Sequence, residues 1–172
     1  NESLLDTYDT QLITLSKSLS HVRADFVDKF VPFLSANEGL IVFEHETCSM
    51  TYQSQILAGD FEHTFLESRK KDLLTLRTNV GSHKDDYSFL MDGQPLKKFG
   101  SQGQQKSFLI ALRLSQYDYL AKATQTKPML LLDDIFDKLD DERIGRLTDL
   151  LSDSARFGQV FITDARKERS SL

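Results

Sequence analysis

The chain has 172 residues, 40% of them hydrophobic, and a formal net charge of −5 at pH 7. This length and composition fit one ordinary globular domain or two small lobes with a real core. The acidic balance excludes a global basic field, so any contact with nucleic acid must come from local patches. Cys48 is the only cysteine, which excludes an intrachain disulfide and a Cys-rich zinc site and favours a reducing, intracellular location.

An amphipathic helix is predicted at the start of the chain. Apolar side chains recur there at spacings of three and four residues: Leu5, Tyr8, Leu12, Leu15, Leu19, Val22 and Phe26. This heptad seam predicts a helix over about 3–31, ended near Pro32. Two uses of the seam stay open: packing on the helix's own domain, and pairing of an extended arm with another helix. No membrane-spanning run or signal peptide is present, and the pattern begins directly at Asn1, so we expect a piece of a longer protein.

Two short strands and a second helix follow. Residues 40–43 and 49–53 have the pattern of strands flanked by turn-forming residues. A helix over about 60–76 is expected to turn five apolar side chains inward: Phe61, Phe65, Leu66, Leu73 and Leu74. Its outer face carries Arg69, Lys70 and Lys71, which form either a solvated face or a contact for nucleic acid.

The segment 80–93 combines a polar loop with a strand. Residues 87–91 predict a strand that turns at Asp92-Gly93. In the loop before it, His83 lies close in sequence to Asp85 and Asp86. That grouping is compatible with a metal site or with a loop held by local hydrogen bonds.

The stretch GSQGQQKS at 100–107 matches the phosphate-binding pattern Gly-x-x-x-x-Gly-Lys-Ser/Thr at every fixed position except Gln105. A P-loop must follow a buried strand, whereas a proline and two lysines precede this stretch. We therefore reject the P-loop and expect a Gly-x-x-Gly turn before a helix that is capped by Ser101 and runs to about residue 122. Such a helix N-terminus favours an anion, although an ordinary capped helix explains the stretch equally well.

The segment 128–134 decides between these two interpretations. Residues 129–132 form a continuous apolar run typical of a fully buried parallel strand, and Asp133 and Asp134 follow at its carboxyl end. Adjacent carboxylates there are costly unless they serve a cation. One can hold magnesium while the other orients or deprotonates a water, as in a Walker B motif. Simple capping of a turn is the alternative use of the two aspartates.

A helix and a strand complete the predicted elements. Acidic residues from Asp140 onward suit a helix N-terminus, and Gly158 is expected to be the C-cap of that helix. Residues 160–163 predict a second short buried strand. The inner face of the helix is expected to hold four aliphatic side chains: Ile144, Leu147, Leu150 and Leu151.

Four stretches in this order resemble an ABC-type ATPase head, and most closely the RecF family of SMC-like recombination mediators. They are GSHKDD at 81–86, SQGQQKS at 101–107, LLLDDIFDKLD at 130–140 and QVFIT at 159–163. The second stretch corresponds to the signature motif of that superfamily, and the end of the third to its D-loop. The sequence departs from the family pattern at Ser82 and Lys84, where Pro and Arg are more usual. It also has Asp164 after the last strand, where many ABC proteins have a histidine.

The resemblance implies an α/β fold, as a mixed α+β part of a P-loop ATPase head with a helical arm. It divides the chain into a helical arm with short strands over 1–75, a signature-motif region over 76–126, and a Walker B and D-loop part over 127–172. The Walker A half is absent and by resemblance lies upstream of Asn1. We therefore expect the chain alone to show no ATP hydrolysis.

The resemblance also implies roles for individual residues. Asp133 serves Mg²⁺, and Asp134 is the catalytic carboxylate that positions the attacking water. ATP held by Walker A of one subunit is closed over by the signature of the other, so ATP drives homodimerisation. The residues at that nucleotide are Ser101, Gln102, Gly103, Gln104, Asp137 and Asp140.

The resemblance implies three partners: DNA at single-strand/double-strand junctions or gaps, RecO and RecR. It also implies a cytoplasmic protein that acts in DNA repair, replication and the SOS response. Candidates for phosphate contacts are basic residues in two places: Arg69, Lys70, Lys97 and Lys98. A non-catalytic DNA- or protein-interaction module and another SMC-type ATPase head are the alternative functions.

Overall fold

The computed structural model describes residues 2–41 and 47–164. They belong to two compact units. The arm unit comprises Asn1–Lys29 and Met50–Ser88, and the head unit comprises Phe30–Ser49 and Phe89–Leu172. No helix in these described ranges is long and apolar enough to cross a membrane.

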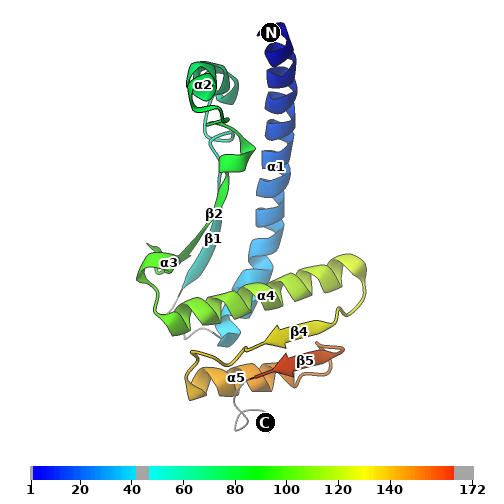
Figure 1. The fold of residues 1–172 in the computed structure, drawn as a ribbon. Coiled ribbons are helices and arrows are strands. Elements are labelled where there is room, and N and C mark those ends of the chain that lie inside the picture. The colour runs from blue at the N-terminus through cyan, green and yellow to red at the C-terminus, as the bar shows by residue number, and fades with distance from the viewer. Residues whose placement is uncertain (1, 42–46, 165–172) are drawn as a thin grey trace. The chain divides into compact units, whose positions relative to one another are not determined.

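The first helix, α1, runs over Glu2–Ile41 and includes Pro32 (Figure 1). The prediction that this helix ends near Pro32 is wrong. A proline inside a helix costs about 3 kcal/mol because it removes one backbone hydrogen bond and crowds the preceding turn. Phe30 and Leu34, on either side of it, are 4% and 1% exposed, and their burial offsets that cost. The strand predicted over 40–43 is wrong at Leu40 and Ile41, which complete α1; residues 42 and 43 lie outside the described ranges.

The predicted heptad seam of α1 is not its buried face. All seven of its side chains are exposed, from Phe26 at 36% to Leu15 at 65%. The buried side chains of α1 follow a different stripe: Ile13, Ser16, Ser20, Val27, Phe30, Leu34 and Asn37. Three of these are polar, because this stripe meets hydrogen-bonding partners as well as apolar ones. Hydrophobicity alone therefore indicated the wrong face.

The second helix, α2, spans Phe61–Thr75 and packs by only one end of its predicted apolar face. Phe61 and Phe65 are buried, with Ile13 and Ile56, in the core of the arm unit. Leu66, Leu73 and Leu74 are exposed, so the prediction that they point inward is wrong. Asp60 caps the helix by accepting a hydrogen bond from the His63 backbone N–H, at 3.2 Å.

A three-stranded sheet has the order β1-β2-β3. Its strands are Cys48–Gln53, Asp86–Met91 and Gln94–Pro95. β2 and β3 pair antiparallel across Asp92 and Gly93, whose φ values of 50° and 74° are those of a tight hairpin turn. The predicted strand and turn are confirmed here. Cys48 is a free thiol, 6% exposed, at the start of β1.

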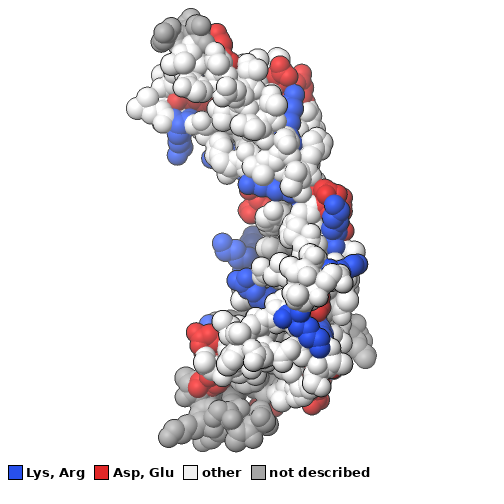
Figure 2. Space-filling view, turned by 90° about the vertical axis from the view of Figure 1, so that its right-hand side faces the viewer, with Lys and Arg blue, Asp and Glu red and all other residues white. Residues whose placement is uncertain are grey.

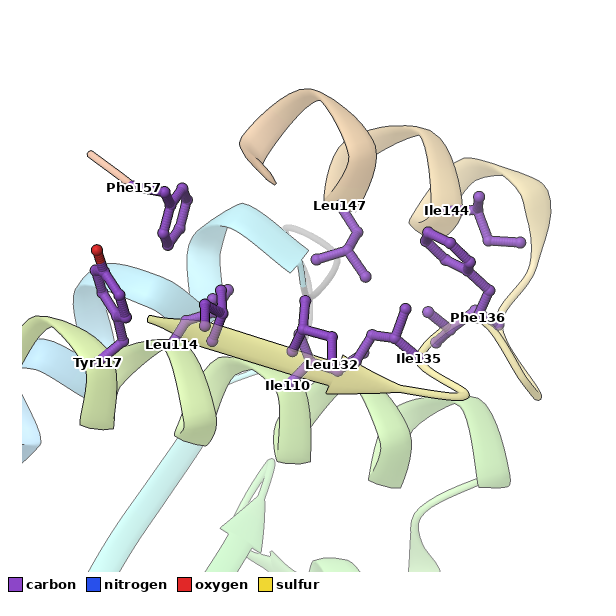
Figure 3. Close-up of a cluster of buried hydrophobic side chains, with 11 residues drawn as sticks. Ile110, Leu114, Tyr117, Leu132, Ile135, Phe136, Ile144, Leu147 and Phe157 are labelled. Atoms are coloured by element: carbon purple, nitrogen blue, oxygen red, sulfur yellow. The ribbon is translucent and has the colours of Figure 1, made fainter. Parts of the chain in front are cut away.

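The head unit is built from α3 (Leu96–Phe99), α4 (Gln102–Thr124), β4 (Leu130–Asp133), α5 (Asp141–Leu151) and β5 (Val160–Thr163). β4 and β5 are parallel, in a register that pairs Leu130 with Val160 and Asp133 with Thr163. Side chains from α4, β4 and α5 point toward one another in one core (Figure 3). Its labelled members include Ile110, Leu114, Leu132 and Leu147.

Of the two parallel strands, β4 is buried on one face only, and β5 has no fully buried residue. Leu130 and Leu132 belong to the core, whereas Met129, Leu131 and Phe161 are 57%, 68% and 52% exposed. The strands are confirmed, but the expectation of full burial is wrong, because no element among the described residues covers the other face. Gly158 is also not the C-cap of α5. Ser152 has that place, and another turn follows before Gly158, closed by the Phe157 N–H donating to the Asp153 carbonyl at 3.0 Å.

Candidate functional site

The N-terminus of α4 is closed by a capping box. The Ser101 hydroxyl accepts the Gln104 backbone N–H at 3.2 Å, and the Gln104 side-chain oxygen accepts the Ser101 N–H at 2.7 Å. The predicted cap at Ser101 is confirmed. Ser101 and Gln102 are exposed, so the remaining amides of the first turn and the positive end of the helix dipole are accessible to an anion.

The surroundings of this turn support rejection of the P-loop. The residues before it form the helical turn α3, not a strand. A Cβ added at Gly100 would lie 2.7 Å from the Leu96 carbonyl oxygen, so only glycine fits there. Gln105 donates from its side-chain amide to the Gly100 carbonyl at 2.8 Å. The residue that broke the P-loop pattern therefore closes the turn, and Ser107 is fully buried in the helix.

The double aspartate lies where β4 ends beside β5. The Asp133 carboxylate accepts a hydrogen bond from the Thr163 hydroxyl. Asp134 has a left-handed φ of 48°, and its backbone N–H donates to the Thr163 carbonyl at 3.0 Å. Both side chains are exposed. A left-handed non-glycine residue is unusual, and such residues concentrate at functional sites.

The loop from Ile135 to Asp140 is held by its apolar members. Ile135, Phe136 and Leu139 are buried in the head core, which leaves Asp137 partly exposed and Asp140 exposed. Asp140 accepts the Arg143 backbone N–H at 2.9 Å and forms an ion pair with the guanidinium of Arg143 at 2.7 Å. The pKa of the Asp140 carboxyl lies below its ordinary value, chiefly because of that backbone hydrogen bond.

Within the head unit, the start of α4 lies against the segment from Asp134 to Arg143. A Cβ added at Gly103 would lie 3.4 Å from the Lys138 carbonyl oxygen and 3.5 Å from a guanidinium nitrogen of Arg143. Lys106 donates from Nζ to the Asp134 carbonyl at 2.9 Å. The start of α4 thus contacts both Asp134 and the loop that follows it. Sequence reasoning missed the contact of Lys106 with Asp134 and the approach of Arg143 to Gly103, because the partners are far apart in the sequence.

Few side chains of the described residues are available as ligands for the magnesium ion that Asp133 is predicted to serve. The described part of the chain contains no group of three or more His, Cys, Asp or Glu side chains that could hold a metal ion. One exposed carboxylate at the end of a strand fits an ion that keeps most of its ligands from water and phosphate, as Mg²⁺ does.

The loop at 81–86 is a hydrogen-bonded structure. Asp85 has a side chain only 1% exposed and accepts hydrogen bonds from the hydroxyls of Ser20, at 2.9 Å, and Tyr52. Arg23 forms an ion pair with it at 3.3 Å and also donates to the Ser82 carbonyl at 2.7 Å. Within the loop, the Lys84 N–H donates to the Gly81 carbonyl at 2.9 Å. These contacts favour a hydrogen-bonded loop over a metal site, although the partners of Asp85 are distant in sequence and not local.

The four basic candidates for phosphate contacts differ in their surroundings. Arg69 is paired with Asp6 at 2.7 Å and with Asp9 at 2.9 Å. Lys70, Lys97 and Lys98 are exposed. In the face shown in Figure 2, neither basic nor acidic side chains form a continuous field. Lys97 and Lys98 are neighbours in sequence, so these two exposed lysines form a small basic cluster.

Comparison with known proteins gives consistent relatives. No protein-family model matches the chain. The DNA replication and repair protein RecF of Cytophaga hutchinsonii is 44% identical over 169 residues, which are 98% of this chain and 45% of that protein. The protein of the same name from Flavobacterium johnsoniae is 42% identical over 166 residues, 96% of this chain and 46% of that protein. The chain thus spans a little under half the length of these relatives.

Two solved structures have the same fold. They are of the recombination mediator protein RecF in the RecFOR pathway, as RecF-ATP and as RecF-ATPrS. Each has a TM-score of 0.78 and covers 98% of this chain; the identities are 26% and 25%, and the shares of those chains are 46% and 47%. The predicted mixed α/β fold, as part of an ATPase head, is confirmed. Over nearly its whole length the chain is thus similar to a part of the RecF proteins.

Proposed function

We propose that this chain provides the signature and Walker B parts of an ATP-dependent DNA-binding protein of recombinational repair and replication restart. The observation that carries the proposal is the joining, in one compact unit, of a capped helix N-terminus at Ser101 with two exposed carboxylates at the end of a parallel strand. The match over nearly the whole chain to RecF-ATP supports it.

In this proposal each group has one task. Ser101, Gln102, Gly103 and Gln104 present the amides and hydroxyl of the α4 terminus to the γ-phosphate held by the opposing subunit. Asp133 serves Mg²⁺. Asp134 orients the attacking water and accepts its proton. Asp137 and Asp140 lie at the dimer interface beside that nucleotide. Mg²⁺-ATP, when bound, supplies the phosphoanhydride whose cleavage reopens the dimer.

The partners follow from the same proposal. The ATP-bound homodimer holds DNA at a gap or a single-strand/double-strand junction and recruits RecO and RecR in the cytoplasm. Lys97, Lys98 and Lys70 contact the phosphates. Arg69 is the weakest of the four candidates, since two carboxylates already neutralise its charge.

The signature assignment is tested with Ser101→Arg in the full-length protein. The larger cation occupies the position of the γ-phosphate and removes the cap, so we expect loss of ATP-dependent dimerisation, measured by light scattering with and without ATP. Ser154→Arg is the matched control, because Ser154 is an exposed serine outside the site. Dimerisation of the Ser101 variant at the wild-type ATP concentration would show that α4 does not contact nucleotide.

The catalytic assignment is tested separately with Asp134→Asn. This change keeps the size of the side chain and removes the base, so ATP binding and dimerisation persist while phosphate release falls about 100-fold or more. Phosphate release at the wild-type rate would remove Asp134 from the mechanism without affecting the signature assignment. Loss of dimerisation in this variant would contradict the division of tasks proposed here.

A further inference from the structure

Lys106 has a contact that neither a P-loop nor a signature motif requires. It lies five residues after the cap Ser101, in the second turn of α4. Its Nζ donates to the backbone carbonyl of Asp134 at 2.9 Å. A lysine that bound phosphate would direct its ammonium group outward, whereas this one is partly buried and directed at the peptide group of the Walker B loop.

The residue that receives this bond is held in an unfavourable backbone conformation. Asp134 has φ of 48°, which costs free energy for any residue with a Cβ unless its surroundings impose it. Two bonds do so here. Its N–H donates to Thr163 of β5 at 3.0 Å, and its carbonyl accepts from Lys106. Both peptide groups of Asp134 are therefore fixed, one by the sheet and one by α4.

We propose that Lys106 is a positioning residue for Asp134, and that it ties the conformation of this carboxylate to the first turns of the signature helix in the same chain. The inference rests on the proposed function for the role of Asp134. Since the α4 terminus contacts nucleotide in one site of the dimer and Asp134 acts in the other, the bond makes hydrolysis in one site dependent on closure of the other. Gly103, packed against the Lys138 carbonyl, provides a second point of contact between the same two segments.

The first test needs no nucleotide. In full-length protein, Lys106→Met keeps the length of the side chain and removes the donor. We expect amide hydrogen exchange in the peptide that contains Asp134 to accelerate at least tenfold, because the left-handed turn loses one of its two restraints. Lys106→Arg retains a donor and should restore slow exchange. Lys127→Met is the matched control: Lys127 also donates from Nζ to backbone carbonyls, those of Ser154 and Ala155, but not to Asp134.

The second test measures hydrolysis by the same variants. Lys106→Met should lower kcat about ten- to a hundredfold with KM for ATP and ATP-dependent dimerisation unchanged, since only the carboxylate is displaced. Lys106→Arg should recover most of kcat, and Lys127→Met should leave it unaltered. A purely structural role would lower stability in both lysine-to-methionine variants without this separation of kcat from KM.

The outcomes separate this inference from the proposed function. Unchanged exchange at Asp134, or faster exchange with normal kcat, overturns the role of Lys106. Loss of dimerisation in Lys106→Met also overturns it, because the lysine would then act at the signature itself. If Asp134→Asn hydrolyses ATP normally, the proposed function fails, while the exchange experiment still decides whether Lys106 holds the loop.

Discussion

Asp85 shows how a single carboxylate organises the arm unit. Burial of its side chain raises its pKa, but hydrogen bonds from Tyr52, Ser54 and Ser20 and the charge of Arg23 outweigh burial, so the pKa of Asp85 lies below its ordinary value. The ionised form is therefore favoured in the folded state. Its stabilisation is complete above the unfolded-state pKa of about 3.9 and is lost as the pH falls through the lower folded-state pKa.

We predict that Asp85→Asn lowers the free energy of unfolding at pH 7 by about 2 kcal/mol, because Arg23 and three hydroxyls lose a charged acceptor. Unfolding in urea at a series of pH values should also show a shallower loss of stability below pH 4 than in the wild-type protein. Asp25→Asn is the control, since its ion pair with Lys29 is exposed. Equal acid sensitivity of wild type and Asp85→Asn would contradict the prediction.

At the residue scale the sequence was a partial guide. It grouped Asp85 with His83 and Asp86 and left two interpretations open, a metal site and a loop held by local hydrogen bonds. The partners of Asp85 in the structure include Ser20, which is 65 residues away in the sequence, and Tyr52, which is 33 residues away. Ser101 was predicted correctly as a cap, and Asp140 was placed correctly at a helix N-terminus, since both features depend only on residues within the next turn.

The C-terminus of α2 has an unfavourable residue that a substitution can improve. Leu76 is the C-cap, with φ of 53° in the left-handed region, and its side chain is 91% exposed. Glycine adopts this conformation without a Cβ clash, and burial does not justify leucine here. We predict that Leu76→Gly raises the free energy of unfolding by about 0.5–1 kcal/mol.

The matched control for this change is Leu74→Gly. Leu74 is also exposed, at 86%, but lies inside α2, where glycine is unfavourable. Opposite shifts of the thermal midpoint for the two leucines are expected in calorimetry. A fall in both variants would show that the side chain of Leu76 has a packing role.

Element faces were harder to predict than element positions. The apolar seam of α1 is regular, yet its side chains are exposed. The buried face of the helix instead contains Ser16, Ser20 and Asn37. The strand β4 was located correctly, but one of its faces is exposed. In each case the element's own pattern specifies that apolar surface exists, while the neighbour that covers it is set by the rest of the fold.

At the scale of the whole molecule, one polar network joins distant parts of the chain in the head unit. Asn37 of α1, 1% exposed, donates to Asp118 of α4 at 2.8 Å. Arg156, after α5, forms an ion pair with Asp118 at 2.7 Å and donates to the Asn37 side chain. Asn37 is 81 positions from Asp118 and 119 positions from Arg156 in the sequence, and no spacing rule connects them.

We predict that Asp118→Ala lowers the free energy of unfolding by about 2–3 kcal/mol, because the partly buried guanidinium of Arg156 and the amide of Asn37 lose their common acceptor. Asp149→Ala, at an exposed position of α5, should change it by no more than about 0.5 kcal/mol. Guanidinium denaturation of both variants measures the difference. A similar small effect for both would mean that the network contributes little to stability.

The position of Cys48 has a practical consequence for experiments on this fold. The thiol is buried at the first residue of β1 and is the only one in the sequence. A thiol reagent added to the native chain can therefore react only when that end of the strand opens. Its labelling rate reports the local opening equilibrium at one defined position, with no engineered label and no other cysteine to correct for.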